Sequence, residues 1–258
     1  MDANLRARVR TALLVGPLIV LLVVAGGPGF LLAVLVAGAL GGYELAQLPG
    51  NAPRRAAIAM ALCVPALSLA VAYAQAWLLL ALLAPALAGL RSRRATLPGT
   101  AGALYVGVAL GLLLLLRNGE DGRLWTLVLF ANNWSADSVA MLGGRRFGRH
   151  RLAPSISPGK TVEGALLGLL AGVLAGLALA VAGGIPLALA LPLNLAVALA
   201  TLGGDLLESL LKRQWQAEDS GTLLPGHGGL LDRMDGTLLA APVMWLILQV
   251  FQGNYGLV

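Results

Sequence analysis

Residues 164–182 read GALLGLLAGVLAGLALAVA, nineteen consecutive positions without an ionisable side chain. A helix rises about 1.5 Å per residue, so about 20 apolar residues cross the hydrocarbon layer of a bilayer. Within this stretch Gly168, Gly172 and Gly176 recur at every fourth position. That spacing allows a second helix backbone to approach closely. The stretch therefore predicts a transmembrane helix that packs along a face of glycines.

The composition extends this prediction to the whole chain. Of 258 residues, 58% are hydrophobic and only 12% are charged, about half the charged share of a soluble domain. So little charge cannot cover a water-facing surface. The apolar runs are continuous and lack the alternation of an outer-membrane barrel strand. The only cysteine, Cys63, excludes an intrachain disulfide and a cysteine metal cluster. We expect an all-α, polytopic integral membrane protein.

About nine apolar runs are candidates for membrane spans. They lie near 9–25, 29–48, 56–73, 76–90, 97–116, 124–142, 164–182, 185–207 and 237–252. The first run continues into the second without a small-residue cleavage site, so we expect a retained span rather than a signal peptide. We also expect two regions: an N-terminal multi-span region over 1–123, and a C-terminal catalytic region over 124–258 with cytoplasmic loops at 143–163 and 208–237.

The basic residues predict the orientation. With nine spans and a cytoplasmic N-terminus, sixteen of the eighteen lysines and arginines fall inside, and only Arg117 and Arg123 fall outside. This is the bias expected of cytoplasmic loops, and it places the C-terminus outside. The net charge of +6 is then explained by orientation and anionic head groups rather than by nucleic-acid binding.

The first polar cluster lies at the end of the eighth run. It consists of Asp205, Glu208, Ser209 and Lys212. In a helix these side chains share one face, and ionisable groups beside a span are costly enough to indicate function. Carboxylates, a hydroxyl and an ammonium on one stripe suit a metal ion and a phosphate. The alternative is a solvated helix end with a snorkelling lysine.

The second cluster is the run PGHGGLLDRMDG at 225–236. Glycines around His227 let backbone amides approach an anion, although a single histidine can also simply complete a hydrogen-bond network. Asp232 and Asp235 share a face if they begin a helix, and their oxygens suit Mg²⁺. For Asp235 the alternative is capping of that helix.

The third cluster is SISPGKT at 155–161, after an arginine-rich stretch that positive-inside retention also explains. Ser157 and Lys160 are placed to contact a phosphate where the next span begins. A P-loop is excluded because Pro154 stands where its first glycine belongs. Asp137, within the sixth run, needs a cation or a water-filled cavity. Glu44 is either interfacial or functional.

Together, these clusters favour metal-assisted phosphoryl or nucleotidyl transfer at a membrane surface. They also resemble the phosphatidate cytidylyltransferases, or CDP-diacylglycerol synthases, over about residues 130–237. The resemblance rests on the runs 134–138 and 143–161, and on Ser209, Lys212, Arg213, Asp219, the run 225–229, Asp232, Arg233 and Asp235. It implies transfer of a cytidylyl group from CTP to phosphatidic acid, giving CDP-diacylglycerol and pyrophosphate in phospholipid biosynthesis.

The resemblance also implies roles for individual residues. The metal ligands are Asp205, Asp232 and Asp235, with Mg²⁺ as the cofactor and a second cation left open. The catalytic residues are Asp205, Asp232, Lys212 and Arg233. The substrate-binding residues are Ser157, Lys160, Ser209, Arg213, His227, Gly228, Gly229 and Asp137. The implied setting is the bacterial cytoplasmic (inner) membrane with the site facing the cytoplasm, and the implied partners are CTP, phosphatidic acid, membrane lipids and a second copy in a homodimer.

Two positions depart from the family pattern. Glu218 stands before Asp219 where the family usually has lysine, and Val162 replaces a common aromatic residue. A divergent paralogue therefore stays open, as does a related CTP-dependent enzyme such as a polyprenol or phytol kinase or a CDP-archaeol-type synthase. A transporter is the distant alternative. It would spread charges through the midplane, whereas here the charges gather at the cytoplasmic ends.

Overall fold

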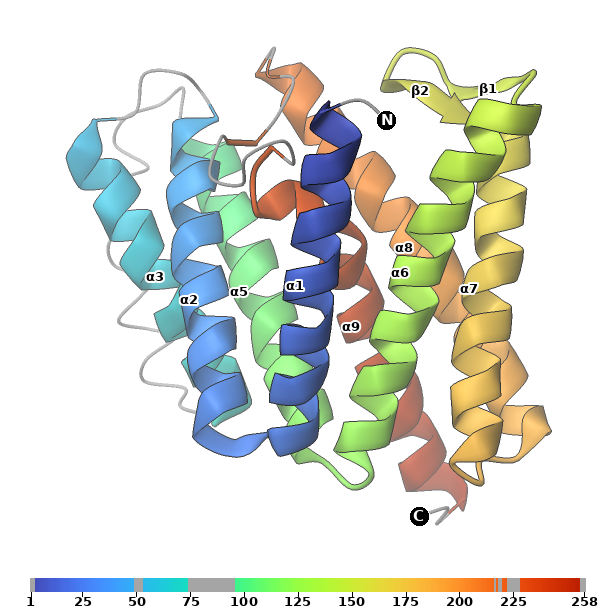
Figure 1. Ribbon diagram of the computed structural model, residues 1–258. Helices are drawn as coiled ribbons and strands as arrows, with labels where there is room; N and C mark the ends of the chain where they lie inside the picture. Colours follow the sequence, from blue (N-terminus) through green and yellow to red (C-terminus); the bar gives the residue numbers. More distant parts are fainter. Residues whose placement is uncertain are drawn as a thin grey trace. The chain divides into compact units, whose positions relative to one another are not determined.

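The computed structural model describes residues 3–48, 53–73, 96–215, 217, 220–221 and 228–255. Figure 1 shows that the described chain is almost entirely helical. It divides into two compact units. The first unit comprises Met1–Leu115 and Trp215–Met234, and the second comprises Leu116–Gln214 and Asp235–Val258.

The helices follow the predicted apolar runs. They are α1 (Ala3–Ala25), α2 (Gly27–Gln47), α3 (Arg54–Ala72), α5 (Thr96–Asn118), α6 (Gly122–Phe147), α7 (Val162–Ala182), α8 (Leu187–Gln214) and α9 (Leu231–Tyr255). The only strands among the described residues are β1 (Arg151–Ala153) and β2 (Ser157–Thr161), which form an antiparallel pair within the predicted loop 143–163. The predicted all-α class is confirmed apart from this hairpin.

Six helices of the described chain are long and apolar enough to cross a membrane. They cover Gly27–Gln47, Arg54–Ala72, Ala101–Asn118, Val162–Ala182, Leu187–Arg213 and Leu231–Phe251. This confirms a membrane protein, but not the count of nine spans. The run near 124–142 is helical in α6 but is not among the six, and the side chains of α1 that the structure describes form a shorter apolar helix, Leu14–Ala25. The run near 76–90 lies outside the described residues.

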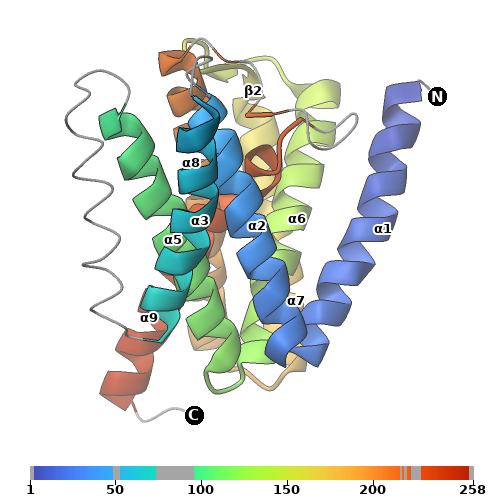
Figure 2. The same cartoon turned by 90° about the vertical axis from the view of Figure 1, so that its left-hand side faces the viewer.

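Glycine contacts hold the helices of the first unit together. A Cβ on Gly42 of α2 would lie 2.5 Å from the Met60 carbonyl oxygen of α3, and one on Gly111 of α5 would lie 2.8 Å from the Ser68 carbonyl oxygen. Figure 2 shows α2 beside α3. Because the backbones are this close, α2 is held firmly at the point where it carries Glu44, whose side chain is only 3% exposed.

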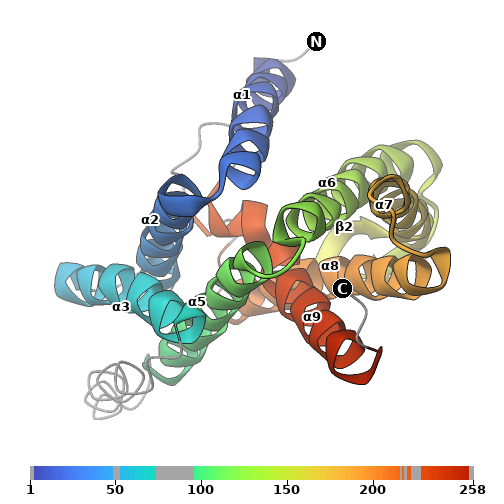
Figure 3. The same ribbon diagram turned by 90° about the horizontal axis from the view of Figure 1, so that it is seen from below.

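In the second unit, α7 packs on α6 through the predicted glycine face. A Cβ on Gly168 would lie 2.7 Å from the Ala136 carbonyl oxygen, and one on Gly172 would lie 2.9 Å from that of Asn132. Figure 3 shows α6 and α7 as neighbours when the molecule is viewed from below. The predicted packing role of these glycines is confirmed.

A buried amide pair joins α6 to α8. Asn132 Nδ2 donates to the Asn194 carbonyl oxygen at 2.9 Å, and Asn194 Nδ2 donates to the Ala190 carbonyl oxygen at 2.9 Å. Both asparagines are fully buried. Gly176 provides the space, since a Cβ there would collide with Asn194 Oδ1. Polar groups inside a membrane helix bundle need such partners.

The β1–β2 hairpin is tied to the start of α7. Thr161 caps that helix, with its Oγ1 accepting from the Gly164 N–H at 3.2 Å. The Glu163 carboxylate accepts from the N–H groups of Arg149 and His150 at 3.0 and 3.2 Å. These contacts fix the base of the hairpin, and Lys160 on β2 is thereby held in place.

Candidate active site

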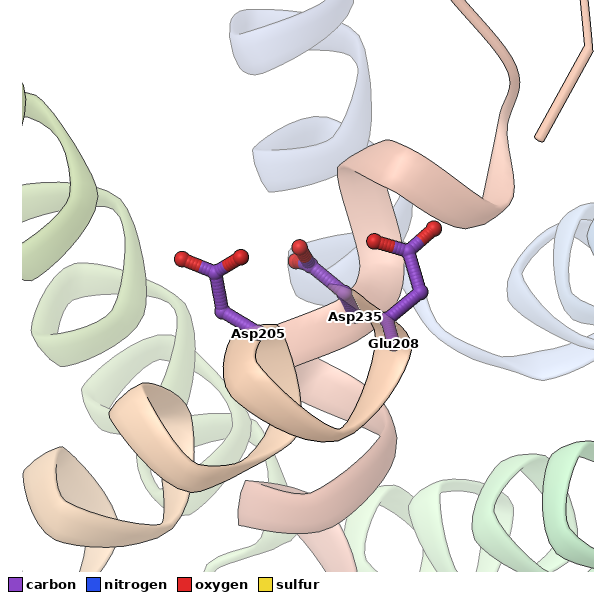
Figure 4. A group of neighbouring side chains, drawn as sticks. All are labelled: Asp205, Glu208 and Asp235. Carbon is purple, nitrogen blue, oxygen red and sulfur yellow. The ribbon is translucent and has the colours of Figure 1, made fainter. Parts of the chain in front are cut away.

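Three carboxylates of the second unit come together. Asp205 and Glu208 lie on α8 and Asp235 lies on α9, and their ligand oxygens are within 4.8 Å of one another. Figure 4 shows the three side chains next to each other at this meeting of the two helices. All three are half-buried. The predicted helical face of α8 is therefore present, and α9 contributes the third acid.

A glycine explains why the two helices meet at this point. A Cβ on Gly204 would collide with the Asp235 carbonyl oxygen and lie 3.1 Å from the Gly236 Cα. With glycine at this position, the α8 backbone lies directly against α9. The next residue of α8, Asp205, is thus brought beside Asp235.

Two lysines are paired with the acids of α8. Lys160 Nζ on β2 lies 2.5 Å from Asp205 Oδ1, and 3.5 Å from Ser209 Oγ. Lys212 Nζ lies 3.1 Å from Glu208 Oε2, one helical turn away on α8. The hairpin and α8 therefore each place a lysine ammonium group beside the acids.

A polar network extends from the acids to α6. The Asn133 amide satisfies its neighbours when Nδ2 donates to Asp137 Oδ2 at 3.0 Å and Oδ1 accepts from the Thr237 N–H at 2.8 Å. Thr237 lies two residues after Asp235 on α9. Asp137, which the sequence singled out within the sixth run, is therefore joined through Asn133 to the helix that carries Asp235.

The acidic group has the chemistry of a hard-cation site. The Asp235 carboxylate is repelled by the negative charges of Asp137, Asp205 and Glu208. Like charges this close need cations to compensate them. Carboxylate oxygens within 4.8 Å of one another match the ligands that Mg²⁺ takes, often together with waters and substrate phosphate. The residues therefore fit a divalent cation.

Asp232, one of the predicted metal ligands, has a different environment in the first unit. Its Oδ2 accepts from the N–H groups of Ser220 and Gly229 at 3.0 and 2.8 Å. It is not part of the three-acid group found among the described residues. Glu208, which the sequence placed on a helix face suited to a metal ion but which was not among the assigned metal ligands, takes part in that group. The capping alternative for Asp235 is wrong, because α9 already begins at Leu231.

Glu44 is the residue whose role the sequence left open. Its Oε1 accepts from the Leu230 N–H at 2.8 Å and its Oε2 from the Leu231 N–H at 2.9 Å. Ser220 Oγ donates to Oε2 at 3.5 Å. Glu44 therefore binds the first N–H groups of α9, in the same unit as Asp232. The pair Gly41-Gly42 just before it was the available hint of a close helix contact.

The remaining predicted site residues are placed as follows. Ser157 lies on β2, Ser209 is buried on α8, and Arg233 is exposed on the first turn of α9. Arg213 Nε donates to the Ile156 carbonyl oxygen at 3.1 Å. Gly228 has a φ of +77°, and the Gly229 N–H is directed to Asp232. His227, Glu218 and Asp219 lie outside the described residues.

The sequence matches the cytidylyltransferase family over residues 6–251. The chain belongs to this family. A phosphatidate cytidylyltransferase of Brucella abortus biovar 1 (strain 9-941) is 37% identical over 96% of this chain and 95% of its own length. Proteins of the same name are 35% identical in Bacillus subtilis (strain 168), over 59% of this chain and 58% of theirs, and 38% identical in Rickettsia felis, over 57% and 68%.

Membership of the cytidylyltransferase family confirms the resemblance inferred from the motifs. It also extends that resemblance beyond residues 130–237, because the match begins at residue 6 and includes α2 with Glu44. The hydrophobic N-terminal region is thus part of the family's architecture rather than an unrelated addition.

Proposed function

We propose that this protein transfers the cytidylyl group of CTP to phosphatidic acid, giving CDP-diacylglycerol and pyrophosphate in phospholipid biosynthesis. The observation that carries the proposal is the group of Asp205, Glu208 and Asp235 with Lys160 and Lys212 paired to it. Acids that suit a cation, beside ammonium groups that suit phosphates, are what nucleotidyl transfer needs. The family and the names of the relatives supply the substrates.

In this reaction a phosphate oxygen of phosphatidic acid attacks the α-phosphorus of CTP. A new P–O bond forms, the bond to the bridging oxygen breaks, and pyrophosphate leaves. The ammonium groups of Lys160 and Lys212 lie beside the acids that would hold the cation. They are therefore close enough to neutralise the charge of phosphates bound to that cation. A divalent cation held by Asp205, Glu208 and Asp235 would stabilise negative charge on the transferred group. We propose Mg²⁺ for this role.

The other sequence-based assignments belong to the same proposal. Asp232 and Arg233 act from the first turn of α9, with Asp232 three residues before Asp235 on the same helix. Such a spacing directs two side chains to one side of a helix. The substrate contacts are proposed to come from Ser157, Ser209, Arg213, His227, Gly228, Gly229 and Asp137.

We place the protein in the bacterial cytoplasmic membrane with nine spans, the N-terminus and the site on the cytoplasmic side, and the C-terminus outside. The distribution of lysine and arginine supports this topology. A division into an N-terminal region over 1–123 and a catalytic region over 124–258, and a homodimer, complete the proposal on the resemblance.

The test is an assay of purified protein in detergent with CTP, Mg²⁺ and phosphatidic acid. We expect equal amounts of pyrophosphate and CDP-lipid, and no turnover after EDTA is added, with recovery when excess Mg²⁺ is restored. A lipid kinase would instead release CDP and phosphorylate an alcohol. Release of CDP, or no product in any of these reactions, would contradict the proposed function.

A further inference from the structure

The first turn of α9 is held by a carboxylate from the other end of the sequence. Glu44 lies on α2, yet its two oxygens accept from the N–H groups of Leu230 and Leu231, 186 and 187 residues away. Its side chain is 3% exposed. A buried charge costs several kcal/mol unless it is compensated. The two N–H groups therefore offset the cost of burying the Glu44 carboxylate.

No basic side chain compensates Glu44 within the part of the chain that the structure describes. Its partners are the two N–H groups and the hydroxyl of Ser220. The first N–H groups of a helix have no partner within the helix and carry partial positive charge. Glu44 therefore satisfies the start of α9 with its charge.

The same segments are bound a second time by Asp232. Its Oδ2 accepts from the N–H groups of Ser220 and Gly229, so Ser220 and the start of α9 are each held by both carboxylates. A Cβ on Gly229 would collide with Ser220 Oγ and lie 2.8 Å from Glu44 Oε2. A Cβ on Gly41 would lie 3.0 Å from Leu231 Cδ2. Glu44, Ser220, Gly229 and Asp232 thus form one closely packed unit.

We infer that Glu44 is a positioning residue for the reaction: it fixes the first turn of α9, the helix that carries the proposed metal ligands Asp232 and Asp235. Glu44 itself contacts neither cation nor substrate. This inference rests on the proposed function, in which Asp232 acts at the metal. It assigns to α2 a part in holding the start of α9, although α2 carries none of the motif residues.

The experiment compares Glu44→Gln with wild type in two measurements. The glutamine keeps the shape but loses the charge and turns an NH₂ group toward an N–H donor. Hydrogen–deuterium exchange of peptides that cover 228–235 should be about tenfold faster in the variant, as expected when a hydrogen bond to a charged group is lost. The Mg²⁺ concentration for half-maximal turnover should rise about tenfold, with KM for CTP at saturating Mg²⁺ changed less than twofold.

Glu120→Gln is the matched control, because Glu120 is an exposed carboxylate in the turn before α6 and its variant should match wild type in both measurements. If Glu44→Gln does not fold, Glu44→Asp replaces it. The aspartate keeps the charge but is one methylene shorter, so we expect changes in the same direction of about threefold.

Three outcomes separate the inference from the proposed function. A variant with a lower melting temperature but wild-type exchange and Mg²⁺ dependence would show a purely structural role and overturn the inference. Faster exchange with unchanged Mg²⁺ dependence would overturn it as well. A wild-type protein without cytidylyl transfer would contradict the proposed function, while the exchange measurement would still decide whether Glu44 holds α9.

Discussion

Individual carboxylates in this protein are stabilised in two different ways. Asp205 and Glu208 have lysine partners at 2.5 and 3.1 Å. Glu44 and Asp232 instead accept backbone N–H groups around the start of α9. An ammonium group can move to a substrate phosphate, whereas a backbone N–H group stays in place. Asp205 and Glu208 are therefore suited to exchange partners during a reaction, whereas the contacts of Glu44 and Asp232 with N–H groups hold the start of α9 in place.

We predict that Asp235→Asn lowers the rate of cytidylyl transfer at least 100-fold. Even changes to residues that only hydrogen-bond to a metal ligand cost about 10- to 100-fold. The measurement is initial rate of pyrophosphate release over a range of Mg²⁺ concentrations. Asp121→Asn is the control. Asp121 has a φ of +48° in an exposed turn, and asparagine adopts that conformation readily. An Asp235→Asn protein with near wild-type rate would remove Asp235 from the proposed cation site.

Sequence reasoning identified Asp205, Asp235 and the lysines because charges beside apolar runs stand out. It assigned Asp232 rather than Glu208 as a metal ligand. The close approach of α8 to α9, where Gly204 lies against the Asp235 carbonyl oxygen, is not visible in the sequence. The partners of Glu44 were equally hidden, because its contacts join residues 187 positions apart. Local patterns do not report contacts at that separation.

Among the elements, α7 shows how glycine substitutes for side-chain packing. Its glycines lie against the α6 carbonyl oxygens of Ala136 and Asn132, where lipid tails offer no hydrophobic gain for association and close packing must provide it. The regular spacing made this face predictable from sequence. The β1–β2 hairpin was not predicted, because Arg151–Ala153 and Ser157–Thr161 are too short and polar to show an alternating pattern.

We predict that Gly168→Ala destabilises the protein by about 1–3 kcal/mol, because its Cβ would meet the Ala136 carbonyl oxygen at 2.7 Å. Thermal unfolding in detergent should show a melting temperature several degrees lower, at about 2–4 °C per kcal/mol. Gly16→Ala in α1 is the matched control, since a Cβ there has no neighbour within 4 Å and alanine favours a helix. Equal melting temperatures for the two variants would argue against close α6–α7 packing.

For the molecule as a whole, the positions of the basic residues predict an orientation in the membrane, which the apolar runs alone do not. Six helices of the described chain qualify as spans by length and composition, whereas the positions of the basic residues favour the nine spans that we propose. Polar residues such as Asn132 and Asp137 lower the hydropathy of α6, yet these residues have partners inside the second unit. A helix that serves the site can therefore be less apolar than one that only faces lipid.

The proposed topology predicts the labelling of single cysteines in a Cys63→Ala background. Glu120→Cys and Ser155→Cys introduce thiols at two exposed positions, between α5 and α6 and in the β1–β2 turn. In intact spheroplasts, a membrane-impermeant maleimide should label position 120 at once and position 155 only after permeabilisation. Labelling of position 155 from outside would contradict a cytoplasmic site. Labelling of both from the same side would contradict the crossing by α6.

The bond between Glu44 and α9 also has a consequence for biosynthesis. Glu44 leaves the ribosome 187 residues before Leu231, and at about 5–20 residues per second its backbone partners are made about 10–40 s later. During this interval α2 carries a carboxylate whose final partners do not yet exist. Synthesis of the start of α9 is therefore the event that completes the contacts of Glu44, and a ribosome stalled before residue 230 would leave the acidic side chain of α2 exposed to membrane quality control.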